Sequence, residues 1–244
     1  MMEVAFSHVR SIVGAAFNVP FTIACSLFVI LSGFLNLQNI ATQLMRGWAT
    51  VVMFVFGIKI VFAGDQNLPD QDGGIIVFNH QSHFDIPAIM MTTTKNIRFG
   101  AKIELFKIPF FGAAMRKVGT LPIARDNRNE VLKIYREAEA RLKENTIFVL
   151  APEGTRQKEP VLGRFKKGPF LFAINAQVPI IPVVIKGAHA VLPKDSLGVN
   201  VGAWSRTIQL EYLPPFPTKG MRPEDVGMLL DRVRERMDEA YQRL

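Results

Sequence analysis

The amino-terminal part of the chain contains a long stretch without charge, and this feature restricts the fold most. No Asp, Glu, Lys or Arg occurs from residue 11 to residue 43, and two strongly apolar runs cover residues 21–37 and 48–63. Each run is short for a membrane-spanning helix, which needs about 20 apolar residues. We expect two tilted spans or, preferably, a helical hairpin buried in one leaflet. Two core helices of a soluble domain are the alternative, but so long an uncharged stretch disfavours them.

Charge and cysteine content narrow the class of partner and the compartment. The formal net charge of +8 over 244 residues favours an anionic partner: a membrane surface, a phosphorylated substrate or nucleic acid. The sequence has no Lys- and Arg-rich run interleaved with aromatic residues, which disfavours nucleic acid. Cys25 is the single cysteine, so an intramolecular disulfide and a cysteine-based zinc cluster are excluded. No small-residue cleavage site follows the first apolar run, and we expect a retained anchor at the cytoplasmic face of the inner membrane.

A polar segment with Pro69 and two adjacent glycines, residues 65–74, separates the apolar part from the remainder. We therefore expect a membrane-associated helical hairpin over residues 1–64 and an α/β domain over residues 65–244. Short apolar runs rich in β-branched residues predict strands at 75–78, 97–101, 120–124, 146–150, 180–185 and 207–212. Apolar periodicity predicts helices over 127–144, capped by Asn127, and over 223–241. Alternating strands and helices indicate a mostly parallel sheet covered by helices on both faces.

A polar loop directly follows the first predicted strand and contains His80 and Asp85. In α/β proteins such loops lie at the carboxyl ends of the strands, where ligands bind. The imidazole of His80 can accept a proton from an alcohol that attacks a thioester, and Asp85 can fix the tautomer and stabilise the resulting cation. Covalent catalysis lacks a candidate, because no Gly-x-Ser-x-Gly turn occurs and Cys25 lies in an apolar run. Direct attack by an acceptor hydroxyl is therefore the simpler mechanism.

Three other interpretations of this loop stay open on the residues alone. Asp85 can be the last residue of a capping box that begins at Ser82. His80 can be a hydrogen-bonded histidine without a chemical role. Together with His83 these residues can also hold zinc or iron. Only two further histidines occur in the chain, so such a metal site is short of ligands, and we expect no metal.

Two basic segments follow the fourth predicted strand. The first reads Ala-Pro-Glu-Gly-Thr-Arg and ends at Arg156, and the second, residues 164–169, contains Lys166 and Lys167 and leads into a helix. Glycine lets the backbone approach a ligand, arginine offers a fork to phosphate oxygens, and a helix start adds a positive field. These features suit a phosphate, although a solvated basic turn has the same composition. Arg125, after the third predicted strand, is a second possible phosphate ligand, or a surface ion-pair partner of Asp126.

Four ordered segments within residues 73–190 give the chain a resemblance to the 1-acylglycerol-3-phosphate acyltransferase family. The loop with His80 and Asp85 resembles the family's His-x4-Asp block, the segment ending at Arg125 its second block, residues 152–156 its third and residues 178–183 its fourth. The resemblance implies that His80 is the general base and that Asp85 orients it. It also implies that five residues hold the glycerol phosphate: Arg125, Glu153, Gly154, Thr155 and Arg156. An acyl-CoA or acyl carrier protein donor, and no cofactor or metal, are further implications.

We therefore expect a membrane enzyme that acylates the sn-2 hydroxyl of 1-acylglycerol 3-phosphate, with Lys166 or Lys167 assisting the arginines at the phosphate. Pro122, Ala124 and Ala151 depart from the residues usual in the second and third blocks. Another lysolipid acceptor, such as a lyso-ornithine lipid or lysophosphatidylglycerol, is therefore an open alternative. Three further alternatives are a non-catalytic lipid-binding membrane protein, a metal-dependent phospholipid hydrolase, and acylation of glycerol 3-phosphate itself.

Overall fold

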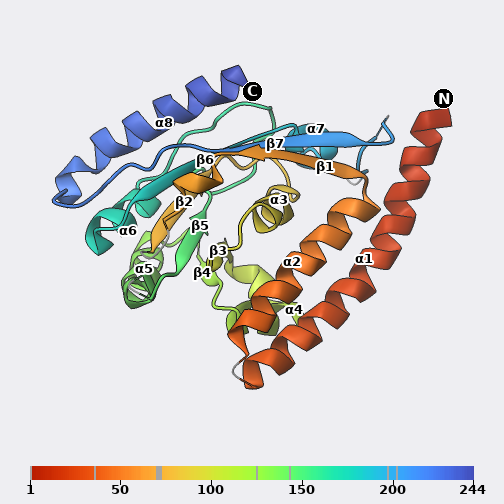
Figure 1. Ribbon diagram of the computed structural model, residues 1–244, viewed down its shortest axis with the longest axis horizontal. Helices are drawn as coiled ribbons and strands as arrows, with labels where there is room; N and C mark the ends of the chain where they lie inside the picture. The colour runs from red at the N-terminus through yellow and green to blue at the C-terminus, as the bar shows by residue number, and fades with distance from the viewer. Residues whose placement is uncertain are drawn as a thin grey trace.

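One sheet of seven strands forms the centre of the molecule (Figure 1). The computed structural model describes residues 2–35, 37–69, 73–124, 126–142, 144–196, 198–201 and 203–244. The strands are β1 (Ile58–Ala63), β2 (Gly74–Phe78), β3 (Ile97–Lys102), β4 (Leu121–Ile123), β5 (Ile147–Leu150), β6 (Ile180–Lys186) and β7 (Arg206–Tyr212). Their order is β1-β7-β6-β2-β5-β3-β4, and neighbours are parallel except the antiparallel pair β6 and β7. The predicted mostly parallel sheet is confirmed.

Helices cover both faces of this sheet. They are α1 (Met2–Phe34), α2 (Gln38–Val55), α3 (Asp85–Met91), α4 (Phe111–Lys117), α5 (Arg128–Leu142), α6 (Gly168–Ala176), α7 (Ala188–Val191) and α8 (Val226–Arg243). Three single turns of 3-10 helix lie at Asp65–Asn67, Ile103–Lys107 and Pro223–Asp225. Apolar side chains from α2, α3 and α7 meet one face of the sheet, and those from α5, α6 and α8 meet the other. Figure 1 shows the second set on the side opposite the amino-terminal helices.

Strand β2 shows why the apolar runs become buried strands. Ile76 and Phe78 join the apolar cluster on the α2 face, whereas Ile75 and Val77 join the cluster on the α5 face. All five residues of β2 are buried. A strand covered on both faces needs apolar side chains at every position, because successive side chains point to opposite faces.

Helix α5 begins where its capping signal predicts. The backbone N–H of Glu130 donates to the side-chain oxygen of Asn127 at 3.1 Å, which satisfies one of the free donors of the first turn. Tyr135, Ala138 and Leu142 are buried against the sheet, as the apolar periodicity predicts. This confirms both the start and the inward face of the helix.

The predicted amino-terminal helical hairpin is present as α1 and α2, which pack against each other at one end of the molecule (Figure 1). His8–Phe34 form a helix of 27 residues that is long and apolar enough to cross a membrane, by length and composition only. Only 17% of its most apolar window is buried within the protein. The exposed apolar side chains include Ile12, Phe28 and Phe34. The outer surface of the hairpin is therefore strongly apolar.

The second apolar run, residues 48–63, is not helical throughout, and here the prediction was wrong. Helix α2 ends at Val55, Gly57 adopts a left-handed backbone with φ 64°, and Ile58–Ala63 form strand β1. Glycine at such a position ends a helix readily, and the β-branched and aromatic residues that follow suit a strand. β1 pairs in parallel with β7 at the edge of the sheet. The division into residues 1–64 and 65–244 stays a prediction, but the first unit supplies one strand to the sheet.

Polar contacts fix the start of α1 to the segment before β7. The Arg10 guanidinium donates to the carbonyls of Val55, at 2.9 Å, and of Trp204. It also lies over the Trp204 ring, 4.4 Å from the ring centre. The hydroxyl of Ser11 donates to the carbonyl of Val199 and accepts from its N–H, both at 2.9 Å. The hairpin is thus held to the sheet by specific contacts as well as by apolar packing.

Candidate active site

The predicted site residues lie at the carboxyl ends of neighbouring strands. The loop with His80 and Asp85 follows β2, residues 151–156 follow β5, and these two strands are parallel neighbours. Lys102 is the last residue of β3, and β3 pairs with the edge of β5 that faces away from β2. Ligands of open α/β sheets bind outside the carboxyl ends of the strands. The topology therefore brings the first and third blocks of the sequence to one place.

One oxygen of Asp85 organises the whole histidine loop. Its Oδ2 lies 2.8 Å from Nδ1 of His80 and also accepts the backbone N–H groups of Gln81 at 2.8 Å and Ser82 at 2.9 Å. The side chain is fully buried, and its other oxygen, Oδ1, has no hydrogen-bond partner in the described chain. Asp85 thus makes the helix-start contact to Ser82 and also orients His80. The capping box is not formed as predicted, because α3 begins at Asp85 and its N-cap residue, Phe84, makes no side-chain cap bond. The catalytic role of the His80–Asp85 pair stays a prediction.

The ring of His80 is fixed on one side and open on the other. Its side chain is 12% exposed, and the edge of the ring meets Phe78 with 5.5 Å between ring centres. A proton on Nδ1 faces the Asp85 carboxylate, which leaves Nε2 as the free lone pair. Among the described residues Nε2 has no hydrogen-bond partner. The arrangement suits a general base whose tautomer is set by a carboxylate, and the catalytic role of His80 stays a prediction.

Three polar residues beside His80 hold the loop in place, and of these the sequence analysis singled out only Ser82, as a possible helix cap. Asn79 continues the ladder beyond β2 by donating to the carbonyl of Ile185 and accepting its N–H, both at 2.8 Å. The Gln81 amide donates to the Tyr241 hydroxyl at 3.1 Å, and the Ser82 hydroxyl donates to the carbonyl of a residue after α7 at 3.0 Å. All three side chains are fully buried. For Asn79 and Gln81, the only signal in the sequence is their place next to His80.

Glu153 reaches the histidine loop from the neighbouring strand. Its carboxylate accepts the backbone N–H of His80 at 3.2 Å and that of Gly163 at 3.0 Å. Burial raises the pKa of Glu153 from the ordinary 4.5 to about 7, although these two backbone donors act in the opposite direction. The hydrogen bond from the His80 N–H to Glu153 holds the backbone of the predicted base in place. Its predicted role at the glycerol phosphate stays a prediction.

Arg156 lies near the two histidines of the loop. The backbone N–H of Gln157 donates to the carbonyl of His80 at 2.8 Å, which places the neighbouring Arg156 beside the loop. Burial and, next, the positive charges of Arg156 and His80 lower the pKa of His83. Arg156 is half-buried, and its guanidinium has no hydrogen bond or ion pair within the described ranges. Thr155 is exposed and accepts a bond from Lys194 at 3.4 Å. A free arginine fork beside a general base suits the phosphate of an acceptor.

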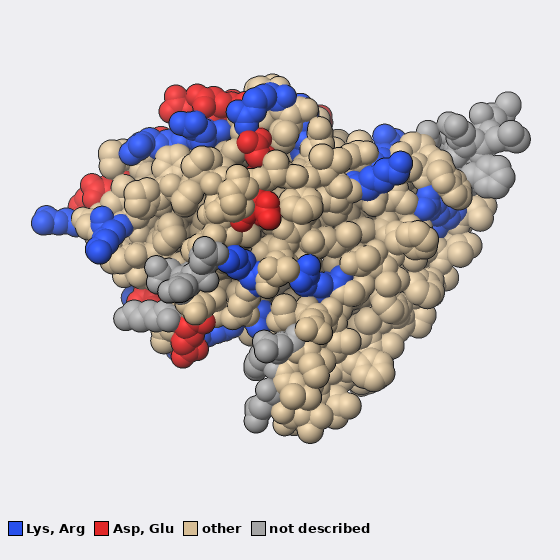
Figure 2. Space-filling model, in the orientation of Figure 1, with Lys and Arg blue, Asp and Glu red and all other residues tan. Residues whose placement is uncertain are grey.

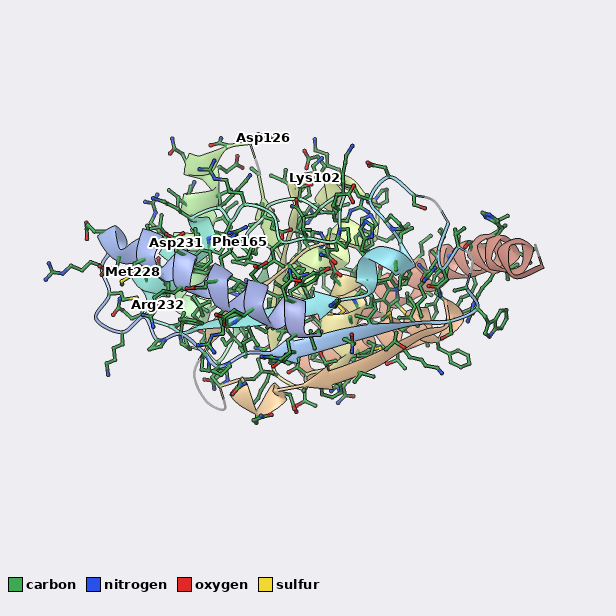
Figure 3. All side chains as sticks on the ribbon, turned by 90° about the horizontal axis from the view of Figure 1, so that it is seen from above. Lys102, Asp126, Phe165, Met228, Asp231 and Arg232 are labelled. Atoms are coloured by element: carbon green, nitrogen blue, oxygen red, sulfur yellow. The ribbon has the colours of Figure 1, made fainter. Side chains whose placement is uncertain are left out.

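Lys166 and Lys167 line a large cavity beside the third block. A space of about 1330 Å³ between the loop after β5 and helices α5, α6 and α8 is lined by both lysines, Gly154 and Arg234. A Cβ on Gly154 would lie 3.0 Å from the Lys166 ammonium nitrogen, which places this lysine against the third block. Figure 3 shows Phe165 and Asp231, which also line this cavity, beside α8. The two lysines therefore reach the third block from the α5 face of the sheet.

The second block is only partly placed. Arg125 lies outside the described residues, so its predicted role stays a prediction. The neighbouring strand end carries Lys102, which the sequence analysis missed, and which pairs in register with Ile123 of β4. Figure 3 shows Lys102 and Asp126 on the same side of the molecule. Lys102 is half-exposed and lies 3.5 Å from Glu104, so a cation is available at this edge of the site.

An apolar cavity extends from the histidine loop between the hairpin and the sheet. It has a volume of about 300 Å³ and is lined by His83, by Trp48 of α2, by Phe99 of β3 and by Ala114 and Val118 of α4. Residues of α1, including Cys25 and Val29, complete the wall. The hairpin thus contributes one side of a cavity that begins at the predicted catalytic loop.

Comparison with known proteins places these features in a family. A family profile described as Acyltransferase matches residues 59–186. The 1-acyl-sn-glycerol-3-phosphate acyltransferase alpha of Homo sapiens is 30% identical over 203 residues, which are 83% of this chain and 70% of that protein. The 1-acyl-sn-glycerol-3-phosphate acyltransferase of Haemophilus influenzae is 28% identical over 211 residues, 84% of this chain and 85% of that protein. The crystal structure of the acyltransferase PlsC from Thermotoga maritima has a TM-score of 0.84 and 24% identity, covering 99% of this chain and 97% of that one, which shows a common fold.

Proposed function

The chain belongs to the acyltransferase family, and on that premise we propose that it acylates the sn-2 hydroxyl of 1-acylglycerol 3-phosphate, giving phosphatidate. The acyl donor is a thioester of coenzyme A or of acyl carrier protein. The observation that carries the proposal is the His80–Asp85 pair, joined at 2.8 Å with Nε2 left open. Two relatives that bear the name of this activity support the choice of acceptor.

The chemical step needs a base at the acceptor hydroxyl. Nε2 of His80 takes the hydroxyl proton as the oxygen bonds to the thioester carbon. The carbon–sulfur bond then breaks, and the thiolate leaves with the proton that the imidazolium returns. The buried carboxylate of Asp85 stabilises the imidazolium between these two transfers. A positioned base of this kind contributes about 100- to 10,000-fold to the rate.

The acceptor phosphate binds beside the base in this proposal. Arg156 supplies a guanidinium that makes no protein hydrogen bond in the part of the chain that is described, and its charge already acts on the histidine loop. Lys102 adds a cation at the end of β3, and Arg125 stays a further predicted phosphate ligand. Charge-assisted bonds to phosphate also fix the direction of the glycerol, because arginine binds with two parallel N–H groups. The sn-2 hydroxyl is thereby held close to Nε2.

An acyl chain occupies the apolar cavity that begins at His83. Its volume of about 300 Å³ and its lining by α1, α2 and α4 suit a hydrocarbon chain. The exposed apolar surface of α1 lies next to this cavity, so a chain can pass between a lipid layer and the cavity without crossing water. We propose that the hairpin sits in the membrane surface for this reason.

The test is acyl transfer by the purified full-length protein onto a panel of lysolipids. Labelled acyl-CoA and acyl carrier protein serve as donors, and each reaction is run with and without chelator. Acylation of 1-acylglycerol 3-phosphate well above lyso-ornithine lipid and lysophosphatidylglycerol, unchanged by chelator, supports the proposal. Preference for another lysolipid moves the assignment to that acceptor. Absence of transfer with both donors overturns the proposal and favours a lipid-binding role.

A further inference from the structure

A third cavity lies at the opposite ends of the strands, and its lining carries more positive than negative charge. It has a volume of about 800 Å³ and is bounded by α2, the segment before β3, the end of α4 and the end of α5. Its charged lining residues are Arg46, Arg98, Lys117, Arg141 and Glu144. Four cations therefore face one carboxylate. Figure 2 shows Lys and Arg side chains in the middle of the face it presents, where the hairpin meets the sheet.

Arg98 is the central member of this group. It is 5% exposed on strand β3, and its guanidinium has one hydrogen bond in the described ranges, at 2.7 Å to the carbonyl of Ile97. No ion pair joins it to a carboxylate within those ranges. Burial and the nearby charge of Arg141 lower the pKa of Arg98 to about 10. A guanidinium buried without an anion is costly, and among the described residues the hydrogen bond to Ile97 is its one bond to the protein.

The other cations surround the same space. The guanidinium of Arg141 lies against Gly119, where any Cβ would collide with it, and its carbon is 5.0 Å from the centre of the Phe148 ring. Glu144 acts to raise the pKa of Arg141, but burial lowers it by more. Lys117 lies 4.1 Å from the ring centre of Phe34. Arg141 and Lys117, each held against an aromatic ring, thus have their charged ends set in place before any ligand arrives.

The uncharged lining suits a ligand with hydroxyl or ester groups. It includes Thr42 and Gln43 of α2, Thr94 and Asn96 before β3, and Thr146 before β5. The side-chain amide of Asn96 donates a hydrogen bond to the hydroxyl of Thr146 at 3.3 Å. A volume of about 800 Å³ is much larger than one phosphate needs, and it falls within the range of small-molecule sites. The lining therefore fits an organic phosphate better than a simple ion.

We propose that this cavity binds a phosphate ester, with the phosphate between Arg98, Arg46 and Arg141. The site is separate from the acceptor site, because it lies at the amino ends of β3 and β5 and His80 follows the carboxyl end of β2. A lipid headgroup and a soluble phosphate ester share the recognised chemistry. Arg46 comes from α2 of the hairpin, and Val118 lines this cavity and the apolar cavity alike, so the ligand sits beside the acyl-chain space.

The test measures phosphate binding to the full-length protein in detergent as the rise in thermal midpoint with inorganic phosphate, at constant ionic strength. The Arg156→Gln change is present in every protein, so that the acceptor site contributes little. The cavity variant carries Arg46→Gln and Arg141→Gln, and the matched control carries Arg136→Gln, an exposed arginine on the same helix α5. We expect saturable binding in the parent and the control, and binding weaker by about tenfold or more in the cavity variant. Equal binding by all three proteins, or no saturable binding by the parent, overturns the proposal.

Two further arms identify the source of the phosphate. The first repeats the titration with glycerol 3-phosphate, and the second measures flotation with phosphatidylcholine vesicles with and without phosphatidate. A loss of the phosphatidate-dependent flotation in the cavity variant, but not in the Arg136→Gln control, assigns a lipid headgroup. A loss confined to glycerol 3-phosphate assigns a soluble ester. If neither ligand distinguishes the cavity variant from its control, the cavity does not bind phosphate esters.

Discussion

The two ends of the parallel strands hold buried charge in opposite ways. At the carboxyl ends, one oxygen of Asp85 accepts three hydrogen bonds from the chain itself. At the amino ends, Arg98 is buried with a single hydrogen bond to the carbonyl of its neighbour. The bonded oxygen of Asp85 fixes the position of other groups, although Oδ1 has no partner among the described residues. The guanidinium of Arg98 has no carboxylate partner among those residues, which suits an anionic ligand. In our proposal Asp85 therefore positions other groups and Arg98 binds a ligand, although both side chains are almost fully buried.

The largest expected effect comes from removing the charge of Asp85 while keeping its shape. In Asp85→Asn, the amide oxygen can still accept the three bonds that Oδ2 accepts, but it no longer stabilises the imidazolium. We expect kcat to fall by at least about 100-fold while the protein stays folded. Steady-state kinetics measure kcat, and thermal unfolding shows whether the variant is folded. The exposed Asp238→Asn is the control. A variant with nearly wild-type kcat shows that the carboxylate is only a helix-start residue.

Glu153 gives a pH signature of the site. Because its pKa is raised from 4.5 to about 7, the unfolded chain loses this proton at lower pH than the folded protein does. The free energy of unfolding should therefore fall as pH rises from about 4.5 to about 7, by about 3 kcal/mol from this group. Glu153→Gln should remove that part of the pH dependence, and the exposed Glu235→Gln should leave it unchanged. Denaturant unfolding at a series of pH values tests this, and identical pH profiles for the three proteins contradict it.

The Arg156→Gln change tests whether the cationic site beside His80, and not the cavity around Arg98, holds the acceptor phosphate. Loss of charge-assisted bonds to a phosphate costs about 1.5 to 3 kcal/mol, which is roughly 10- to 150-fold in affinity. The change should appear in KM for the lysophosphatidate acceptor and leave KM for the acyl donor nearly constant. Kinetics with each substrate varied in turn measure this, with the exposed Arg136→Gln as control. An equal rise of KM for donor and acceptor argues that Arg156 does not hold the acceptor phosphate.

The smallest effect concerns acyl-chain length. Ala114 lines the apolar cavity, whereas its neighbour Ala113 is absent from the lining. In Ala114→Phe the larger side chain shortens the space for the acyl chain, and each excluded methylene is worth about 0.8 kcal/mol. Competition between donors of different length should therefore shift toward shorter chains, with no shift in Ala113→Phe. The same preference in wild type and Ala114→Phe means that the chain lies elsewhere.

Much of the fold follows from local sequence, and the exceptions have physical causes. Strands β2 to β7 were predicted within one residue at either end. Fully buried strands such as β2 and β5 require continuous apolar runs, whereas β7 alternates buried and less buried residues and has an antiparallel neighbour. β1 was missed because its six residues continue the apolar run of α2 and only Phe56 and Gly57 lie between the two elements. An edge strand that joins the sheet beside β7 is stabilised by a partner that lies almost 150 residues later, which no local pattern shows.

The candidate site was predictable where a motif is local and not where it is assembled in space. His80 and Asp85 lie five residues apart, so their contact follows from the turn between them. The bond from the His80 backbone to Glu153 depends on the pairing of β2 and β5, which places two distant loops side by side. The cavity around Arg98 needs α2, β3 and α5 together. In the sequence, Arg98 is one arginine in a predicted strand, and that pattern does not predict a cavity.

The most direct test of the account is the rate of acyl transfer to 1-acylglycerol 3-phosphate by wild type, His80→Ala and His189→Ala. His189 is a matched control, because its ring bonds only the carbonyl of Lys158, at 2.7 Å, among the described residues. The account predicts a loss of about 100- to 10,000-fold for His80→Ala with an unchanged thermal midpoint, and a wild-type rate for His189→Ala. A folded His80→Ala protein that transfers acyl chains as fast as wild type would contradict it.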